Sequence, residues 1–380
     1  MTENTFELFV TCSQNLEEVL AEELYSLGFD RIHLGYRGVY VTASDLNAVY
    51  KINYLSRIGG RVLLPLTRFK CFDSDSLYRV ASKIHWLDYI PKNKTFAIDA
   101  NVTHRKIRNS LFAAQIVKDA ICDQFRDRIG SRPNVDTKAP DVQLNLFVHD
   151  EKAILSFDTS GVPLHKRGYR LESVEAPMQE ALAAAVLRLT QYNGEEKLFD
   201  PCCGSGTILT EAALMVTNTP PGFLRNKWGF MHLPNFNQQD WLSVKNAADQ
   251  LKKPLKKGMI SGIDINKNAV RISKSNLRAC GFHQEIEVTA ADFREYTPEV
   301  LPNLVITNPP HGNRLGDIDT LRPLYRSLGE FLKEKLAKPA RAFIYTGSLE
   351  LAKETGLASK KRYVLDGGGV EARLLEFDLY

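Results

Sequence analysis

The segment Lys197-Leu-Phe-Asp200-Pro-Cys-Cys-Gly204-Ser-Gly206-Thr207 decides the fold of the C-terminal half. Residues 197–199 predict a short buried strand, and residues 208–216 predict a helix that begins directly after the glycines. Glycines at a strand-to-helix turn let the backbone approach a ligand closely, and a helix N-terminus favours negative charge. An ordinary glycine-containing turn would have the same pattern, so the neighbouring strands must decide between the two interpretations.

Outward from this segment, short apolar runs alternate with helical stretches, including one that begins near Glu180 and one at 268–280. Short strands that are apolar on both faces and separated by helices indicate a doubly wound, mainly parallel sheet. The predicted strands are 197–199, 259–263, 286–289, 304–307 and 341–346. We therefore predict an α/β domain at 166–380.

Acidic residues follow two of these strands. Asp264 lies in Ser261-Gly-Ile-Asp264-Ile265-Asn266, and Asp292 lies in Ala290-Ala-Asp292-Phe293. A carboxylate at the end of the second strand of a doubly wound sheet is well placed to accept hydrogen bonds from the ribose hydroxyls of a nucleoside cofactor. The Asp292 carboxylate could accept a bond from an adenine amino group. Each aspartate could instead cap the helix or turn that follows it.

The segment Asn308-Pro309-Pro310-His311-Gly312 follows the strand 304–307 and indicates the class of reaction. Two consecutive prolines make the backbone rigid and remove two amide donors, which leaves carbonyl acceptors beside the Asn308 side-chain oxygen. Such acceptors suit an amino group. A purely structural Asn-Pro-Pro turn is the alternative, but this segment and the three before it are predicted at one edge of the sheet.

The N-terminal half has a different pattern, which predicts two small α+β units at 1–60 and 61–165. In the first unit we expect a strand at 6–11, a helix that Gly28 ends, strand-like alternation at 32–41 and a helix at 46–55. In the second we expect strands at 62–66, 95–102, 143–149 and 152–158, with helices at 74–84 and 110–128. Gly161-Val-Pro163 ends this pattern, so we place the main boundary near residue 165.

The composition is that of a folded protein. Of the 380 residues, 44% are hydrophobic and 25% charged, which argues against bulk disorder. The six cysteines show no zinc-ligand spacing, so we expect free thiols and no metal. No signal peptide and no apolar run of membrane-spanning length is visible, which predicts a cytoplasmic protein that does not bind a membrane.

The net charge of +4 permits a nucleic-acid partner without requiring one. Two basic clusters are candidate RNA contacts, although each could also be a solvated polar face. The two clusters consist of Arg105, Lys106 and Arg108, and of Lys166, Arg167 and Arg170.

A further candidate is the segment 220–241, which is rich in Phe, Trp and Asn. It could frame a substrate entrance, although such residues more often serve packing.

The four strand-end motifs together resemble those of the S-adenosylmethionine-dependent amino-methyltransferases with Rossmann-like catalytic domains. The segment His165-Lys-Arg-Gly-Tyr-Arg170, with Ala176-Pro177 and Glu180-Ala-Leu-Ala183, is similar to the family that joins a THUMP RNA-binding domain to such a catalytic domain. Within it, the sequence most resembles the bacterial 23S rRNA guanine-N2 methyltransferases. Trp86, Asn109-Ser110, Arg132-Pro133 and Asp158-Thr-Ser-Gly161 look THUMP-like, and the unit before them resembles that family's ferredoxin-like domain.

The resemblance implies roles for the motif residues. Asn308, Pro309 and Pro310 would hold the target amine, and His311 stands where the family has a Tyr or Phe that stacks on the flipped base. An imidazole ring can stack with less area. Some members carry a second methyltransferase domain, and we expect this chain to correspond to the amino-methylating part alone. The residues expected to bind S-adenosylmethionine are Asp200, Cys202, Gly204, Gly206, Thr207, Asp264, Ile265, Asp292, Phe293 and Asn308.

These observations predict an S-adenosylmethionine-dependent enzyme that methylates an exocyclic base amine, with guanine N2 of 23S rRNA as the expected target. The expected partner is rRNA, either naked or in a ribosome assembly intermediate. Three alternatives remain open: adenine-N6 methylation of DNA or RNA, guanine-N2 methylation of tRNA, and a non-catalytic RNA-binding assembly factor suggested by His311.

Overall fold

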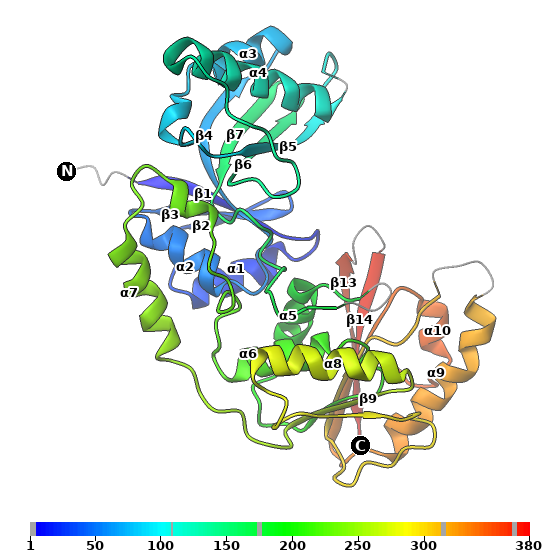
Figure 1. Ribbon diagram of the computed structural model, residues 1–380. Helices are drawn as coiled ribbons and strands as arrows, with labels where there is room; N and C mark the ends of the chain where they lie inside the picture. Colours follow the sequence, from blue (N-terminus) through cyan, green and yellow to red (C-terminus); the bar gives the residue numbers. More distant parts are fainter. Residues whose placement is uncertain (1–4, 108, 173–176, 313–316, 367–370) are drawn as a thin grey trace. The chain divides into compact units, whose positions relative to one another are not determined.

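The computed structural model describes residues 5–107, 109–172, 177–312, 317–366 and 371–380. The chain divides into two compact units, each built on one seven-stranded sheet (Figure 1). The units consist of Met1–Cys12, Leu24–Leu164 and Arg225–Ala247, and of Ser13–Glu23, His165–Leu224 and Ala248–Tyr380. The domain bounds 1–60, 61–165 and 166–380 stay predictions.

The second unit has the strand order β10-β9-β8-β11-β12-β14-β13. Its strands are β8 (Leu198–Asp200), β9 (Ile260–Asp264), β10 (Glu287–Ala290), β11 (Leu304–Thr307), β12 (Ala340–Thr346), β13 (Lys361–Asp366) and β14 (Glu371–Leu379). Its helices are α5 (Glu180–Leu189), α6 (Thr207–Val216), α8 (Lys267–Cys280), α9 (Asp317–Glu334) and α10 (Leu349–Lys353).

The strands β10, β9, β8, β11 and β12 pair in parallel, as the sequence predicts. The sequence interpretation missed β13 and β14, which pair with each other in an antiparallel manner, while β14 also runs antiparallel to β12. Charged residues interrupt both strands, but Leu375, Phe377 and Leu379 alternate on one face of β14 and are buried. That alternation is a strand signal.

One core packs between this sheet and α9. Val305, Ile344 and Phe377 from the strands join Leu328 and Phe331 from α9 in a buried cluster. Complete burial of such a side chain contributes about 1.5–3 kcal/mol relative to exposure. The core therefore holds the central strands, and with them the strand ends, in a defined position.

The first unit has the strand order β2-β3-β1-β4-β7-β6-β5. Its strands are β1 (Phe6–Thr11), β2 (Ile32–Gly35), β3 (Gly38–Ala43), β4 (Val62–Lys70), β5 (Phe96–Thr103), β6 (Val142–His149) and β7 (Lys152–Asp158). The helices of the same chain regions are α1 (Glu17–Ser26), α2 (Asn47–Leu55), α3 (Ser74–Ala81), α4 (Ser110–Ile129) and α7 (Gln238–Asp249), with one-turn helices at Trp86–Asp88 and Gly229–His232. The helix α1 is divided after Glu23 between the two units.

The strand β4 joins the two predicted N-terminal units into one sheet, because it pairs with both β1 and β7. The alternation at 32–41 is not a single strand, and that prediction is wrong. It forms the hairpin β2–β3, whose turn contains Tyr36 and Arg37, with Arg37 at φ 54°. The turn residues lie between Gly35 and Gly38. The strand-like alternation of the sequence continues through them, so this pattern does not reveal the turn.

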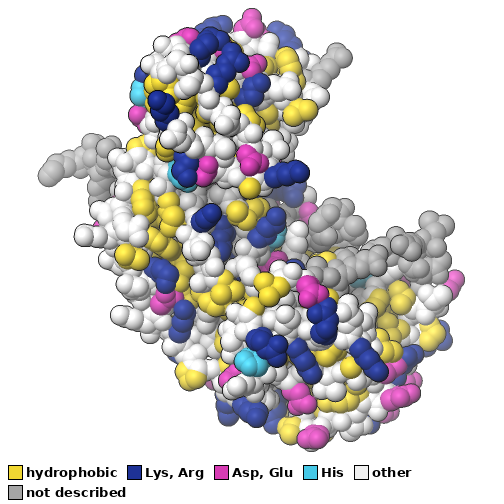
Figure 2. Space-filling model, viewed as in Figure 1, with side chains coloured by type: hydrophobic (Ala, Val, Ile, Leu, Met, Phe, Trp, Pro, Cys, Tyr) yellow, Lys and Arg dark blue, Asp and Glu magenta, His cyan; other side chains and the backbone are white. Residues whose placement is uncertain are grey.

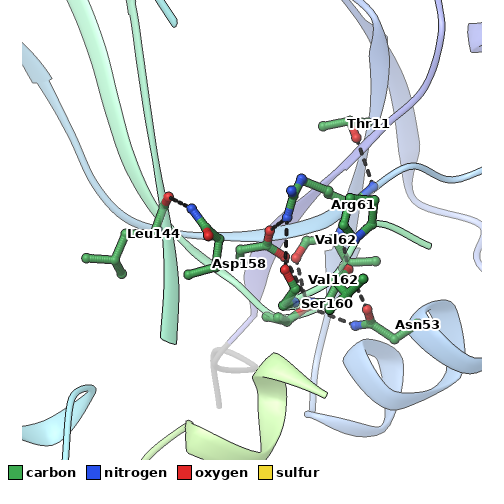
Figure 3. A network of polar contacts seen from close by, with 12 residues as sticks. Thr11, Asn53, Arg61, Val62, Leu144, Asp158, Ser160 and Val162 are labelled. Atoms are coloured by element: carbon green, nitrogen blue, oxygen red, sulfur yellow. Dashed lines mark hydrogen bonds and ion pairs between the residues drawn. The ribbon is translucent and has the colours of Figure 1, made fainter. Parts of the chain in front are cut away.

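Polar side chains connect the two parts of this sheet (Figure 3). The Arg61 guanidinium binds the buried Asp158 carboxylate and donates to the Gly161 carbonyl at 3.1 Å. The Ser160 hydroxyl donates to Asn53 Oδ1 at 2.6 Å, and Asn53 Nδ2 donates to Thr159 Oγ1 at 2.8 Å. These buried groups are paired, and removing one partner would leave the other unsatisfied.

From Arg225 onward, the aromatic segment predicted at 220–241 packs within the first unit, while Phe223 packs against Tyr169 and Leu214 in the second. Trp228 and Phe230 are stacked with ring centroids 5.6 Å apart, and Trp241 lies edge-on to both. The ring of Tyr50 on α2 lies 4.9 Å from that of Phe230, and its hydroxyl accepts a bond from Asn237 N. The structure therefore assigns these aromatic residues to packing, the second of the two roles considered. None of the described helices is long and apolar enough to cross a membrane.

We predict that Phe230→Ala lowers the free energy of unfolding by about 3–5 kcal/mol, because it removes a fully buried ring from this cluster. Denaturant unfolding measures the change. The matched control is Leu242→Ala, because Leu242 is next to Trp241 on α7 and 40% exposed, so its loss should cost little. Equal losses for both variants would contradict the packing role.

Candidate active site

The four sequence motifs meet at one edge of the sheet in the second unit. In the parallel pairings, Asp200 lies opposite Gly262, Ala290 opposite Asp264, and Thr307 opposite Ile344. The strands run in the same direction, so their carboxyl ends lie together, and this is where ligands bind in open α/β sheets. The motifs therefore follow adjacent strand ends.

The glycine turn after β8 is tied to β9. Cys203 N donates to the Ile263 carbonyl at 2.9 Å, and Gly204 N donates to Asp264 Oδ2 at 2.8 Å. Gly204 has φ 54°, and a Cβ at this position would meet no atom within 4 Å. The backbone at Gly204 is thus open to a ligand, and Asp264 fixes its orientation.

Gly206 has a different role, which is packing. It has φ 76° just before α6, and a Cβ there would lie 2.2 Å from the Ser273 hydroxyl oxygen on α8. Ser273 Oγ is buried and has no hydrogen-bond partner among the described residues. Asn276, one turn further on α8, donates to the Ser205 carbonyl at 3.0 Å. The close approach of α8 therefore requires glycine at 206.

Asp200 is a buried carboxylate at the end of β8, with 1% of its surface exposed. Loss of hydration raises its pKa to about 7, although its Oδ1 accepts bonds from Thr307 Oγ1 at 2.7 Å and Cys202 N at 3.0 Å. The Asp264 charge raises it further. This carboxylate links β8 to β11 immediately before the Asn-Pro-Pro segment.

Cys202 lies where the acidic motifs converge. Burial, followed by the charges of Asp200 and Asp264, raises the pKa of its thiol well above the usual value, and Asp292 also contributes. Asp264 is half-buried, and its Oδ1 accepts a bond from Asn266 N at 2.8 Å. The predicted capping of the helix after β9 is carried out by Asn266, whose side chain accepts from Asn268 N and Ala269 N.

The predicted adenine-side residues differ in availability. The Ile265 side chain is 66% exposed at the end of β9. Asp292 accepts hydrogen bonds from Arg294, whose guanidinium lowers the pKa of that carboxyl. Phe293 is 5% exposed and packs in the core edge-on to Phe331. A Phe293 side chain packed in this way has little surface left for a ligand, so its predicted role in cofactor binding stays a prediction for the backbone of this residue.

The Asn308 side chain carries a hydrogen-bond acceptor that has no donor among the described residues. Its Oδ1 is buried and has no hydrogen-bond partner among the described residues. Pro309 is buried, and its carbonyl oxygen lies 3.3 Å from His311 Nδ1. The His311 ring also lies against Gly347, where a Cβ would come within 3.1 Å of the ring. The half-buried imidazole therefore has a defined position beside the Asn-Pro-Pro segment.

Two predicted RNA contacts are internal to the fold. Arg167 is 1% exposed, and its Nε lies 3.4 Å from Oε1 of Glu211, which is buried on α6. Arg170 donates to Glu180 Oε1 at 2.8 Å and to Thr207 Oγ1 at 3.0 Å. These arginines hold the junction segment against α6 and the glycine turn, so the prediction that they contact RNA is corrected. The Thr207 hydroxyl likewise has a protein partner.

The remaining basic candidates are at the surface. Arg105, Lys106 and Lys166 are exposed, and Arg108 lies outside the described residues. The His104 ring accepts bonds from Lys106 N and Ile107 N and contacts the Cys71 carbonyl, which orders the loop. On the face in Figure 2, Lys and Arg side chains are spread out and interspersed with acidic ones. On this face, charge alone therefore does not mark an RNA path.

Sequence interpretation missed the residues that support the site from behind. Glu211 is the single charged residue of the largely apolar helix 207–216, which signals a buried partner such as Arg167. Ser273 and Asn276 are spaced three residues apart on α8, so they share one helix face. The Tyr325 hydroxyl on α9 bonds to Thr346 at the end of β12. No local pattern marks that contact.

Comparison with known protein families identifies the parts of this chain. Residues 167–370 match the RMKL-like methyltransferase domain, residues 71–158 the THUMP domain, and residues 7–63 the RlmL ferredoxin-like domain. The chain belongs to the RMKL-like methyltransferase family. The predicted resemblance and fold class are thereby confirmed.

Several relatives match nearly the whole chain of this family member. A ribosomal RNA large subunit methyltransferase K/L of Syntrophotalea carbinolica is 37% identical over 98% of this chain and 53% of its own length. A putative RNA methyltransferase of Synechocystis sp. is 34% identical over 98% of this chain and 96% of its own length. The chain thus spans about half the length of the K/L relatives it matches.

Solved structures agree with this placement. A putative methyltransferase, SMU.472, complexed with S-adenosylhomocysteine, has a TM-score of 0.87 and 26% identity, covering 99% of this chain and 98% of that chain. A predicted N6-adenine-specific DNA methylase from Listeria monocytogenes has a TM-score of 0.85 and 28% identity, covering 98% and 96%. Both likenesses extend over the whole described fold.

We predict that Gly206→Ala destabilises the protein by about 1–3 kcal/mol, because an alanine Cβ collides with Ser273 and adopts an unfavourable φ. Ser273→Ala alone should be neutral or stabilising, since it removes a buried hydroxyl without a described partner. The double variant should unfold at a higher temperature than Gly206→Ala. Thermal unfolding measures all three, and strictly additive effects would contradict the contact.

We predict that Asp200→Asn changes the pH dependence of stability. A carboxyl whose pKa is raised contributes stability fully below its unfolded value and loses that contribution as pH rises through about 7. The asparagine variant should therefore gain stability relative to wild type between pH 5 and pH 8, by roughly 3 kcal/mol, because the wild-type protein loses about 1.4 kcal/mol per pH unit from pH 5 to about pH 7. Melting temperatures at both pH values test this, with the exposed Asp150→Asn as control. A pH-independent difference would be the contrary result.

Proposed function

We propose that this chain is an S-adenosylmethionine-dependent RNA methyltransferase that modifies the exocyclic N2 amine of a guanine in 23S rRNA. The observation that carries the proposal is the buried Asn308 Oδ1, which has no partner among the described residues and lies at the end of β11. A buried acceptor without a donor costs about 1–3 kcal/mol, so a substrate donor at this position supplies a reason for it.

The acceptor is suited to an aromatic amine. The nitrogen lone pair of such an amine is delocalised into the ring, and hydrogen bonds to its protons favour the pyramidal geometry in which nitrogen attacks. In this proposal, Asn308 Oδ1 accepts a hydrogen bond from one amine N–H, and the Pro309 carbonyl accepts a hydrogen bond from the other. His311 Nδ1 already lies 3.3 Å from the Pro309 carbonyl, so the imidazole orients that acceptor and offers a ring face to the base.

The strand-end residues fit S-adenosylmethionine, which supplies an electrophilic methyl group on sulfur. Gly204 leaves open space above its backbone, where a ligand can approach. The half-buried Asp264 keeps acceptor capacity for ribose hydroxyls beyond its two backbone bonds. Ile265 presents an exposed apolar side chain for the adenine ring. The protein's contribution is therefore to position both substrates.

Support for RNA as the substrate comes from the relatives. The K/L relatives are named as rRNA methyltransferases, and the chain contains a THUMP domain. A base in a helix cannot reach a strand-end site, so the target nucleotide must be flipped out or unpaired. Arg105, Lys106 and Lys166 are the exposed cations proposed to contact the RNA backbone, in free rRNA or in an assembly intermediate.

Adenine N6 is the second candidate target. The amide oxygen of Asn308 and a proline carbonyl can accept bonds from either amine. A structural relative at 28% identity is described as a predicted N6-adenine-specific DNA methylase. Histidine in place of a larger aromatic ring at 311 does not favour one base over the other. The methylated nucleoside that forms therefore decides between the guanine and adenine targets.

We predict that Asn308→Ala lowers the rate of methyl transfer about 100-fold or more, by loss of a positioned acceptor, while affinity for S-adenosylmethionine changes little. Its melting temperature should stay equal or rise, because the removed oxygen has no hydrogen-bond partner among the described residues. The assay uses methyl-labelled S-adenosylmethionine with undermethylated rRNA, tRNA and DNA in parallel, followed by nucleoside analysis.

Labelled N2-methylguanosine from rRNA supports the proposal, and label in N6-methyladenine assigns the second candidate. Asn308→Asp keeps an oxygen at the same position and serves as the conservative variant, which should retain more activity than Asn308→Ala. Wild-type turnover by Asn308→Ala would refute the mechanism.

A further inference from the structure

One face of the sheet in the first unit is not packed like a core. Along β6, buried residues alternate with partly exposed ones, and the exposed set includes Asn145 and Phe147. The same alternation on β1 and β3 leaves Phe9 and Tyr40 half-exposed. A solvated sheet face normally carries polar residues. Here several aromatic rings occupy that face.

These residues line a groove of about 490 Å³. That volume falls in the range of about 300–1,000 Å³ that is typical of pockets for small ligands. Its lining combines aromatic rings with side-chain amides, and β6 contributes one of each. Its lining includes Phe9, Tyr36, Tyr40, Asn101, Asn145 and Phe147.

Tyr36 stands at the rim of the groove in an ordered position. It occupies the β2–β3 hairpin turn, and its side chain is 72% exposed. The next residue, Arg37, has φ 54°, and its carbonyl accepts a bond from Cys12 N at 2.9 Å. A rigid turn thus presents a large aromatic ring to solvent, which has no explanation in packing.

Some rings on this face are nearly parallel to one another, although Phe9 and Tyr40 are tilted by 45°. His33 and Tyr40 are stacked with centroids 4.6 Å apart and an interplanar angle of 13°. Phe147 and His149 are nearly parallel as well, at 17°. Planar ligands therefore meet ring faces held in position by the strands.

Charged side chains also lie at this groove, because Arg37, Arg61 and Asp99 belong to its lining. Arg68 binds Glu7 and lies 5.9 Å from the Tyr40 ring centroid, and Arg61 binds Asp158. Phosphate contacts require cations for single strands and duplexes alike, so charge does not decide between the two. Stacking and amide contacts to base edges instead suit unpaired nucleotides, which proteins recognise on aromatic side chains. The chemistry of the face thus favours single strands over duplexes.

We propose that this groove binds an unpaired segment of the RNA substrate, with bases stacked on Tyr36 and Phe147 and base edges facing Asn101 and Asn145. The proposal rests on RNA being the substrate. It adds a second contact, in the first unit, to the nucleotide that enters the methyl-transfer site.

Binding of two fluorescein-labelled probes to the full chain tests this, an eight-nucleotide single-stranded RNA of mixed sequence and a twelve-base-pair RNA duplex. The variants are Tyr36→Ala, Phe147→Leu and the double variant. Leucine at 147 keeps apolar bulk on the half-buried strand position but removes the ring face. The matched control is Tyr25→Ala, a tyrosine 54% exposed on α1 that does not line the groove.

Each ring removed should weaken single-strand binding about 5- to 100-fold, as for base–aromatic stacking elsewhere, with duplex binding and the Tyr25→Ala control unchanged. Equal weakening for both probes, or no weakening in the double variant, would overturn the proposal. Loss of self-association in the variants, with unchanged RNA affinity, would assign the face to a second copy of the chain.

The readout is binding rather than methylation, so it separates this inference from the proposed function. Calorimetric affinity for S-adenosylmethionine should be the same in all variants. A chain that binds single strands through the groove but yields N6-methyladenine would retain the inference and lose the guanine assignment.

Discussion

The parallel direction of β10, β9, β8 and β11 is the constraint on which the candidate site depends. Parallel strands place their carboxyl ends at one edge, so turns that are remote in the sequence become neighbours. Asp200 and Thr307 are 107 residues apart in the chain and hydrogen-bonded in the fold. If one strand were reversed, its motif would lie at the opposite edge, and the combination of acceptor, carboxylates and open turn would be lost.

Desolvation explains the unusual groups at this edge. The Asp200 carboxyl has a raised pKa because it is cut off from water, and Asn308 Oδ1 is an acceptor cut off from water without a described donor. Both are costly in the free protein. Sites that bind a ligand often keep such groups, because the ligand supplies the missing interaction, and the surrounding core provides the stability that they lose.

The buried arginines show that charge in a sequence does not reveal its surroundings. Arg167 and Arg170 lie beside Lys166 in the chain, yet only Lys166 is exposed. Glu211 and Glu180 neutralise the two arginines inside the fold, where an unpaired cation would be very unfavourable. Conversely, no local sequence pattern marks the aromatic face of the first unit, because its rings come from strands that are distant in the sequence and brought together in the sheet.

By itself the sequence determined the order and type of most elements, since periodicity and turn residues act locally. It also determined the motif residues Gly204, Asp264 and Asn308, whose chemical types suit their strand-end positions. The tertiary structure alone decided that Phe293 packs in the core, that Arg167 is buried, and that β4 merges the N-terminal units into one sheet. It likewise decided that 32–41 is a hairpin and that Ser273 requires Gly206. The reason is physical: burial and pairing depend on which residues approach through space, and local patterns carry no information about that approach.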